Sequence, residues 1–281
     1  FRRVLFRSEL YAAVVVNAAG IWGQRIAEYA DLSVRMFPAK GSLLIVDHRI
    51  NNHVINRCRK PSDADILVPG DTISLIGTTS THVDYSEIDY NRVTAEEVDV
   101  LLREGEKLAP VMAQTRILRA YAGVRPLVAS DNDPSGRNVS RGIVLLDHAE
   151  RDGMDGFITI TGGKLMTYRL MAEWATDAVC RKLGNTERCV TAEQPLPGSR
   201  QSTEKTLQKI ISLPAPLRGS AIYRHGDRTP QWLGEGRLSR SLVCECEAVT
   251  AGEVQYAVEN LTVNNLLDLR RRTRVGMGTC Q

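Results

Sequence analysis

Two consecutive glycines followed by a lysine form the segment whose residue types point most directly to chemistry. The apolar run from Gly156 to Ile160 is typical of a strand. It continues through Gly162 and Gly163 into a helical pattern whose first turn contains Lys164. Backbone N–H groups and the positive end of the helix dipole attract an anion at such a corner, for example a phosphate or a reduced flavin ring. A purely structural turn is the alternative interpretation.

A second corner of this kind lies near the beginning of the sequence. Residues 11–20 read YAAVVVNAAG, which predicts a buried strand that ends in small residues. A helix is expected over residues 21–30. The sequence therefore repeats the order of strand, glycine and helix at two places far apart in the chain.

One arginine occurs in a stiff backbone context. Arg125 lies between Gly123 and Pro126, with a single residue separating it from the glycine. Because proline restricts the backbone, the guanidinium can be held in one direction instead of moving in solvent. Arg125 is therefore a candidate clamp for an anion.

Three of the six cysteines lie near the end of the sequence. Cys244 and Cys246 are separated by one residue, and Cys280 follows later. Six cysteines in 281 residues do not make a disulfide framework, and their uneven spacing indicates a local ligand cluster. The remaining cysteines are interpreted as structural thiols: Cys58, Cys180 and Cys189.

Composition and charge exclude several classes of protein. The 281 residues, 43% of them hydrophobic, suffice for a large core and for two domains. The 36 basic and 33 acidic residues give a net charge of +3, which is too balanced to indicate nucleic-acid binding. No apolar run approaches the roughly 18 residues of a membrane span, and no signal peptide is recognised, so a cytoplasmic location is expected.

The pattern of elements changes along the chain. Short alternating strands with turn signals are expected over residues 34–155, interrupted by a helix that begins after Thr94. Residues 185–218 are rich in Pro, Ser, Thr and Gln, which is typical of a linker. Short helices are expected over 204–211, 250–260 and 263–271.

Six segments together resemble one known family. They read, in order, NAAGIWG, PAKGSLLIV, IGTTS, AGVRPLVASD, VSRGIVLLDH and TGGKLMTYRLMAEWA. The sequence resembles the FAD-dependent glycerol-3-phosphate dehydrogenases, and among them the large catalytic subunit of the bacterial anaerobic, quinone-linked enzymes. The resemblance extends over residues 11–281, and we interpret residues 1–10 as a non-native or unassigned extension.

This resemblance implies an α/β fold with a partial D-amino-acid-oxidase-like FAD-binding domain, an inserted mixed-sheet substrate domain and a truncated ferredoxin-like unit. No Gly-x-Gly-x-x-Gly turn, which would cradle the pyrophosphate of a dinucleotide, occurs in the sequence. We therefore expect the sequence to be truncated at both ends. The expected parts are a partial FAD-binding domain over 11–33 and 156–184, a substrate-binding domain over 34–155, a linker over 185–241, and a truncated two-iron, bacterioferritin-associated-ferredoxin-like domain over 242–281.

The resemblance also implies roles for individual residues. Arg125 and Lys164 are expected in the catalytic centre, where they and Arg141 would bind the substrate phosphate. Two arginines can grip a phosphate that one arginine would not distinguish from a carboxylate. The base that accepts the hydroxyl proton is left open, with His53 and His148 as candidates. The flavin contacts that the resemblance implies are Asn17, Ala19, Gly20, Gly162, Gly163, Leu165 and Thr167.

The three C-terminal cysteines resemble the beginning of a two-iron ferredoxin domain. A [2Fe-2S] cluster takes four cysteine thiolates, and Cys244, Cys246 and Cys280 would supply three of them. The fourth ligand is expected outside this sequence.

The implied activity is the oxidation of sn-glycerol 3-phosphate to dihydroxyacetone phosphate by hydride transfer to FAD, with electrons passed toward quinone. The implied partners are a second flavoprotein subunit, together with a membrane-anchoring iron–sulfur subunit, which would bring the cytoplasmic chain to the inner membrane. Two alternatives stay open: an FAD-dependent oxidase or dehydrogenase of a small hydroxy or amino acid, and a non-catalytic electron-transfer or docking fragment. This sequence alone is expected to retain neither FAD nor activity.

Overall fold

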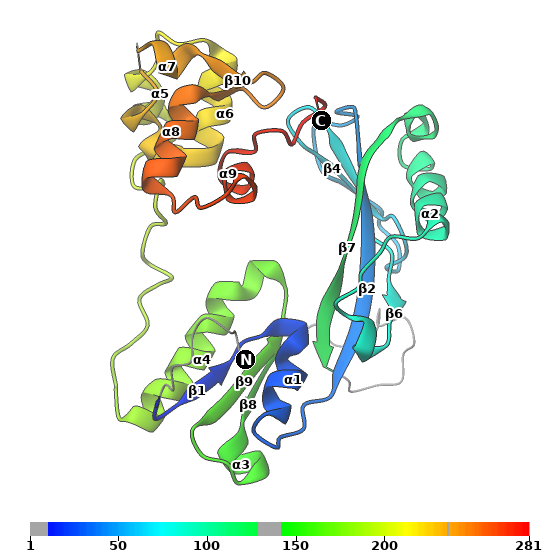
Figure 1. The fold of residues 1–281 in the computed structure, drawn as a ribbon, viewed down its shortest axis with the longest axis vertical. Coiled ribbons are helices and arrows are strands. Elements are labelled where there is room, and N and C mark those ends of the chain that lie inside the picture. Colours follow the sequence, from blue (N-terminus) through cyan, green and yellow to red (C-terminus); the bar gives the residue numbers. More distant parts are fainter. Residues whose placement is uncertain (1–10, 129–141, 235, 281) are drawn as a thin grey trace. The chain divides into compact units, whose positions relative to one another are not determined.

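The computed structural model describes residues 11–128, 142–234 and 236–280. They fall into two compact units, whose elements Figure 1 shows. The first unit takes its described residues from 1–42, 79–93 and 122–193, and the second from 43–78, 94–121 and 194–281. Among the described residues, no helix has both the length and the apolar character that crossing a bilayer requires.

A three-stranded sheet forms the centre of the first unit. β1 (Val15–Asn17) runs parallel to β9 (Phe157–Gly162), which pairs antiparallel with β8 (Ile143–Asp147). β8 joins this sheet although its residues fall in the range predicted for the substrate domain, and the other predicted boundaries stay predictions. The helical elements of this unit are η1 (Gly20–Trp22), α1 (Gly23–Glu28), η2 (Tyr85–Glu87), α3 (His148–Asp152), η4 (Leu165–Thr167) and α4 (Tyr168–Leu183).

The edge position of β1 corrects one expectation. The sequence predicts a buried strand, but Val15 and Val16 are 47% and 38% exposed, and only Asn17 is buried. Within the described sheet, β1 pairs with β9 on one side only. Its valines therefore lack the cover that a central strand would receive.

A second sheet is built around two long strands, β2 (Met36–Val46) and β7 (Ile117–Val128), which pair with each other. The other strands extend the sheet on both sides of β2, in the order β3-β4-β5-β2-β6. Neighbouring strands in this order pair antiparallel. β2 and β7 each contribute residues to both units. The shorter strands are β3 (Ile55–Asn56), β4 (Ile66–Pro69), β5 (Ser74–Gly77) and β6 (Thr81–His82).

Helix α2 (Ala95–Glu106) begins where the sequence predicts it. The Thr94 hydroxyl accepts a hydrogen bond from the Glu97 N–H, and the Glu97 carboxylate accepts one from the Thr94 N–H. On its inner face, Leu101 is fully buried in a core that also contains Leu44, Leu67, Ile76 and Met112, the last from η3 (Pro110–Gln114).

The C-terminal part of the second unit is mostly helical. Residues 185–241 were predicted as linker with one short helix over 204–211, but Ile210, Leu213, Ala221 and Leu233 form a buried cluster there. Apolar residues at helical spacing supply this core, which the high content of Pro, Ser and Thr obscures in the sequence. The elements are α5 (Thr203–Lys209), α6 (Ala215–His225), η5 (Gly226–Gln231), α7 (Arg237–Arg240), β10 (Leu242–Cys244), β11 (Val249–Thr250), α8 (Ala251–Asn260) and α9 (Leu266–Thr273).

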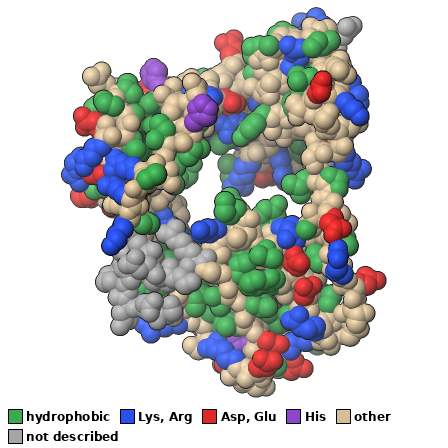
Figure 2. Space-filling model, turned by 180° about the vertical axis from the view of Figure 1, so that it is seen from behind, with side chains coloured by type: hydrophobic (Ala, Val, Ile, Leu, Met, Phe, Trp, Pro, Cys, Tyr) green, Lys and Arg blue, Asp and Glu red, His purple; other side chains and the backbone are tan. Residues whose placement is uncertain are grey.

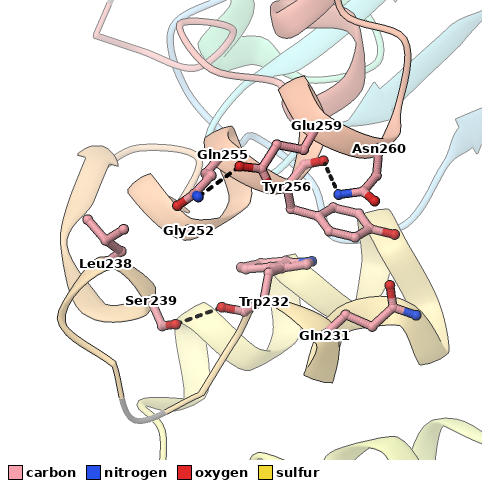
Figure 3. Close-up of a pocket in the computed structure, with 9 residues that line it drawn as sticks. All are labelled: Gln231, Trp232, Leu238, Ser239, Gly252, Gln255, Tyr256, Glu259 and Asn260. Carbon is pink, nitrogen blue, oxygen red and sulfur yellow. Dashed lines mark hydrogen bonds between the residues drawn. The ribbon is translucent and has the colours of Figure 1, made fainter.

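Three aromatic rings stabilise the packing of these helices. His225 lies edge-on to both Trp232 and Tyr256, with ring centroids 5.5 and 5.9 Å apart. The rings of Trp232 and Tyr256 lie one above the other in a hollow between α8 and the segment after η5 (Figure 3). Such edge-on contacts orient α6 against α8, the helix that follows the segment bearing Cys244 and Cys246.

Substitution of Leu101 by alanine tests the core of the second unit. We expect the free energy of unfolding to fall by about 2–5 kcal/mol, because the side chain is fully buried and its removal leaves a cavity. Val111→Ala is the control, since Val111 is 51% exposed, and it should cost less than about 1 kcal/mol. Urea unfolding followed by circular dichroism measures both variants. Equal losses would contradict the packing described for α2.

Candidate functional site

The corner after β9 depends on glycine at two positions. Gly162 and Gly163 have φ values of 73° and 69°, in the left-handed region that favours glycine. A Cβ atom on Gly162 would lie 2.3 Å from the carbonyl oxygen of Gly142, and one on Gly163 would lie 2.6 Å from Sδ of Met171. A side chain at Gly162 would therefore push the segment before β8 away from the corner. A side chain at Gly163 would push α4 away.

The backbone N–H groups of the corner are only partly available to a ligand. The Gly163 N–H donates to the Gly142 carbonyl at 2.9 Å, so this predicted flavin donor is already used inside the protein. The Thr167 hydroxyl accepts from the Lys164 N–H at 2.9 Å and thereby caps η4. The Leu165 N–H forms no hydrogen bond with the part of the chain that the structure describes, so it stays available to a ligand.

Lys164 differs slightly from its predicted place. Its backbone is extended, with φ −139° and ψ 162°, and the residue precedes η4 instead of lying in the first helical turn. The glycine turn extends one residue further than the helical pattern suggests. The side chain is exposed, so the cation remains beside the corner.

A cavity of about 790 Å³ opens at this corner, and its walls are mostly apolar. Buried within it, the Thr161 hydroxyl has no hydrogen-bond partner among the described residues. Leu165 and Met166 are 91% and 82% exposed. In the view of Figure 2, apolar side chains gather over the part of the molecule that holds β1, β8 and β9. Walls of this kind, with one unpaired hydroxyl and one backbone donor, fit a planar ring that has a polar edge. The walls include Val16, Gly20, Ile160, Gly162, Tyr168 and Met171.

The guanidinium of Arg125 is fixed, as the sequence predicts, but by backbone carbonyls. Nη1 donates to the carbonyl oxygens of Ala39 and Lys40 at 3.3 Å, and Nη2 donates to that of Thr79 at 3.1 Å. It lies so close to Gly41 that a Cβ there would be 2.3 Å from Nη2. Arg125 therefore fastens β2 to residue 79, and its neighbour Pro126 lines the cavity. Arg141 lies outside the described residues.

The predicted flavin contacts at the turn between β1 and α1 divide into two groups. Asn17 is buried, and its Nδ2 donates to the Gly23 carbonyl at 2.8 Å and to the Thr159 hydroxyl at 3.3 Å. Its Oδ1 accepts from the Ala19 N–H at 3.4 Å. Asn17 thus holds the turn into α1, whereas Gly20, with φ 58°, lines the cavity.

A buried polar network under β9 was not predicted. Nε2 of His148 lies 2.9 Å from the Thr159 hydroxyl, and Nδ1 lies 2.5 Å from an oxygen of Asp152. Through Thr159 the network reaches Asn17. Both ring nitrogens of His148 are engaged and its side chain is fully buried, so it stabilises the corner. His53, the other candidate base, is exposed. The polar Thr159 within an apolar strand was the available signal.

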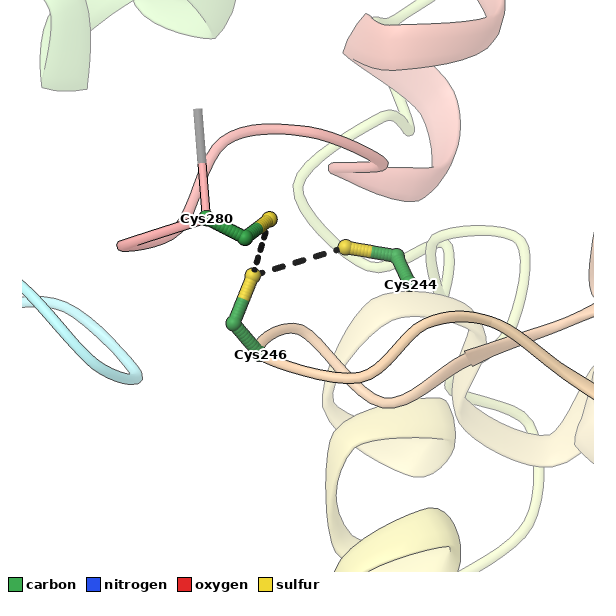
Figure 4. A group of neighbouring side chains, drawn as sticks. All are labelled: Cys244, Cys246 and Cys280. Carbon is green, nitrogen blue, oxygen red and sulfur yellow. Dashed lines mark hydrogen bonds between the residues drawn. The ribbon is translucent and has the colours of Figure 1, made fainter.

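The three C-terminal cysteines meet in the second unit. Cys244 ends β10, Cys246 follows in the next turn, and Cys280 comes after α9; their sulfur atoms lie within 4.8 Å of one another (Figure 4). The Gly276 N–H lies 3.5 Å from the sulfur of Cys244. A Cβ on Gly278 would lie 2.6 Å from the sulfur of Cys246, so the chain passes directly over the thiols. This set of soft ligands fits iron in an iron–sulfur cluster.

Comparisons with known proteins find relatives of both parts of the chain. Residues 3–169 match the family FAD dependent oxidoreductase, and residues 242–281 match the BFD-like [2Fe-2S] binding domain. The chain is 87% identical, over 97% of its length and 50% of that of its relative, to one subunit of the anaerobic glycerol-3-phosphate dehydrogenase of Escherichia coli (strain K12). It is 74% identical to the corresponding protein from Haemophilus influenzae, over 97% of this chain and 48% of that relative.

A solved structure gives the same result for the fold. The glycerol-3-phosphate dehydrogenase from Bacillus halodurans, complexed with FAD, superimposes with a TM-score of 0.69 at 26% identity, over 96% of this chain and 55% of that one. The chain spans about half the length of the curated relatives it matches. The predicted FAD-binding fold and the iron–sulfur unit are thereby confirmed. The match to the FAD dependent oxidoreductase family covers more than half of this chain, so the chain belongs to that family.

Proposed function

We propose that this chain is part of an FAD-dependent glycerol-3-phosphate dehydrogenase. It would oxidise sn-glycerol 3-phosphate to dihydroxyacetone phosphate and pass the electrons through an iron–sulfur centre toward quinone. The observation that carries the proposal is the 87% identity, over 97% of the chain, to one subunit of an anaerobic glycerol-3-phosphate dehydrogenase. The geometry of the two sites supports it.

FAD, when bound, would supply the acceptor for the hydride that leaves the substrate carbon. Among the residues of this chain, the apolar walls beside Gly162 would exclude water from that region. The Leu165 N–H would donate to the ring edge where negative charge develops, and Thr161 would offer a hydroxyl nearby. Gly162 would let the backbone approach the ring.

The substrate phosphate requires cations, and this unit offers them beside the cavity. Lys164 is exposed next to the glycine corner. The three carbonyl contacts of Arg125 fix the position of its charge, so that charge can attract a phosphate without the cost of ordering a mobile side chain. Arg141 is proposed as the third cation on grounds of sequence alone.

No histidine lines this cavity within the described part of the chain. His148, which is held by Asp152 and Thr159, serves the fold and would not accept the hydroxyl proton. The group that would accept this proton stays open.

Electrons would leave through the cysteine site. Cys244, Cys246 and Cys280 would supply three thiolates, and a [2Fe-2S] cluster needs a fourth. The relatives are named as one subunit of an enzyme, which supports further subunits as partners. We propose two such partners, which would associate this chain with the inner membrane: a second flavoprotein subunit, together with a membrane-anchoring iron–sulfur subunit.

Two glycine substitutions test the flavin corner. Gly162→Ala, made in a polypeptide that spans the length of the curated relatives, should lower the affinity for FAD by about tenfold or more, because the new Cβ meets the Gly142 carbonyl. Gly184→Ala is the matched control: its φ of 71° is similar, but nothing lies within 4 Å of the new Cβ. Flavin fluorescence titration measures both. Equal retention of FAD by the two variants would argue against this corner as the binding site.

Substitution of Arg125 tests the substrate site. In the same polypeptide, Arg125→Ala should lower kcat/KM for sn-glycerol 3-phosphate by roughly 30- to 1,000-fold, which corresponds to about 2–4 kcal/mol of transition-state stabilisation. Arg125→Lys keeps the charge but loses the planar fork, so it should recover part of the activity. Arg116→Ala removes a guanidinium that is 67% exposed and serves as the control. A value of kcat/KM within twofold of wild type for Arg125→Ala would remove this residue from the site.

A further inference from the structure

The cysteine site is assembled from two segments that must be held together. Cys246 and Cys280 are 34 residues apart in the sequence, yet their sulfur atoms lie 2.8 Å apart. One segment carries Cys244 and Cys246, and the other is the loop from Arg274 to Cys280 that follows α9. Thiolates repel one another, so contacts outside the thiols must fix the two segments.

An ion pair whose carboxylate is fully buried connects these segments. Nε of Arg274 donates to Oε2 of Glu247 at 2.7 Å, and Nη2 donates to Oε1 at 3.2 Å. Glu247 directly follows Cys246, and its side chain is fully buried. Arg274 ends α9 with a left-handed backbone, φ 65°, and Gly276, whose N–H approaches Cys244, comes two residues later. The hydrogen bond to Glu247 raises the pKa of Arg274, so the guanidinium stays charged.

A second ion pair anchors the first one. Arg224, on α6, donates to the carbonyl oxygens of Glu247 and Ala248 at 3.0 and 3.3 Å. The same guanidinium makes two hydrogen bonds, of 2.7 and 2.6 Å, to the carboxylate of Glu253. Glu253 is fully buried and also contacts Nε2 of His225 at 2.8 Å. The backbone beside Cys246 is thus fastened to α6 and α8, while Arg274 reaches it from the other segment.

We propose that Glu247 and Arg274 are positioning residues that clamp the two cysteine-bearing segments at metal-binding distance. Neither side chain is a ligand. Their two-point contact sets the place of the Cys280 loop over Cys244 and Cys246, and the pair of Arg224 with Glu253 gives that contact a rigid base. The inference rests on the proposed ligand role of the three cysteines.

The first test uses cobalt(II) as the metal probe with this chain. Cobalt bound by thiolates gives a charge-transfer absorbance, which can be titrated under anaerobic conditions. Glu247→Gln and Arg274→Gln should each weaken cobalt binding by about 10- to 100-fold, as losses of outer contacts at metal sites do. The double variant should lose about as much as either single variant, because both remove the same contact. Arg274→Lys, which keeps one charged contact, should fall between.

Two controls make this test specific. Arg188→Gln removes one partner of an ion pair of 2.6 Å whose side chains are 78% and 68% exposed, and it should leave cobalt binding within about twofold of wild type. Cys244→Ser should abolish the absorbance. Unchanged cobalt affinity in folded Glu247→Gln and Arg274→Gln, or losses that multiply in the double variant, would overturn the clamp.

The second test needs no metal and separates the clamp from the ligand role. Cys244 is 6% exposed, so iodoacetamide should modify it slowly in the metal-free chain, while the exposed Cys58 serves as internal reference. Glu247→Gln and Arg274→Gln should speed the modification of Cys244 by about tenfold and leave that of Cys58 unchanged, since loss of the contact opens the loop. An unchanged Cys244 rate would contradict the clamp. A faster rate together with no cobalt absorbance in any protein would support the clamp and contradict the metal-binding role of the cysteines.

Discussion

The close approach of two backbone segments constrains the flavin side of this structure. Gly162 passes so near the Gly142 carbonyl that a Cβ atom would lie 2.3 Å from the oxygen, and the Gly163 N–H donates to that same oxygen. This contact ends the pairing of β8 with β9 and turns the chain toward α4. The Leu165 N–H after this turn has no partner among the described residues, and Leu165 lines the same cavity as the apolar wall. A side chain at Gly162 would therefore change the place where a ring can lie as well as the stability of the corner.

The two sites are held in different ways. The proposed flavin corner uses glycine backbone and a hydrogen-bond network that joins Asn17, Thr159 and His148 and ends at the carboxylate of Asp152. The cysteine site uses charge: Glu247 and Glu253 are fully buried, and each carboxylate receives two hydrogen bonds from an arginine. Breaking a buried ion pair costs more than breaking an exposed one, because the remaining charge stays in a poorly solvated place. Contacts that do not involve the sulfur atoms therefore hold the two cysteine-bearing segments together.

The sequence predicted the features that depend on neighbouring residues. The corner at Gly162 and Gly163, the helix that begins after Thr94 and the meeting of the three cysteines are all present. The glycine corner and the helix follow from the spacing of neighbouring residues. The set of three cysteines follows from the resemblance to a known family. Features that depend on pairing across the chain were missed. Arg274 and Glu247 are 27 residues apart, and no local pattern indicates that they meet. The carbonyl partners of Arg125 and the network around His148 were missed for the same reason, and the helical core over 203–240 was hidden by its polar composition.

Reduction of bound flavin by sn-glycerol 3-phosphate distinguishes the proposed function from its alternatives. A polypeptide that spans the length of the curated relatives, loaded with FAD and kept anaerobic, would be mixed with sn-glycerol 3-phosphate while the absorbance of oxidised flavin is followed. We expect that absorbance to fall and one dihydroxyacetone phosphate to form for each flavin reduced. Reduction by a small hydroxy or amino acid, with none by sn-glycerol 3-phosphate, would contradict it.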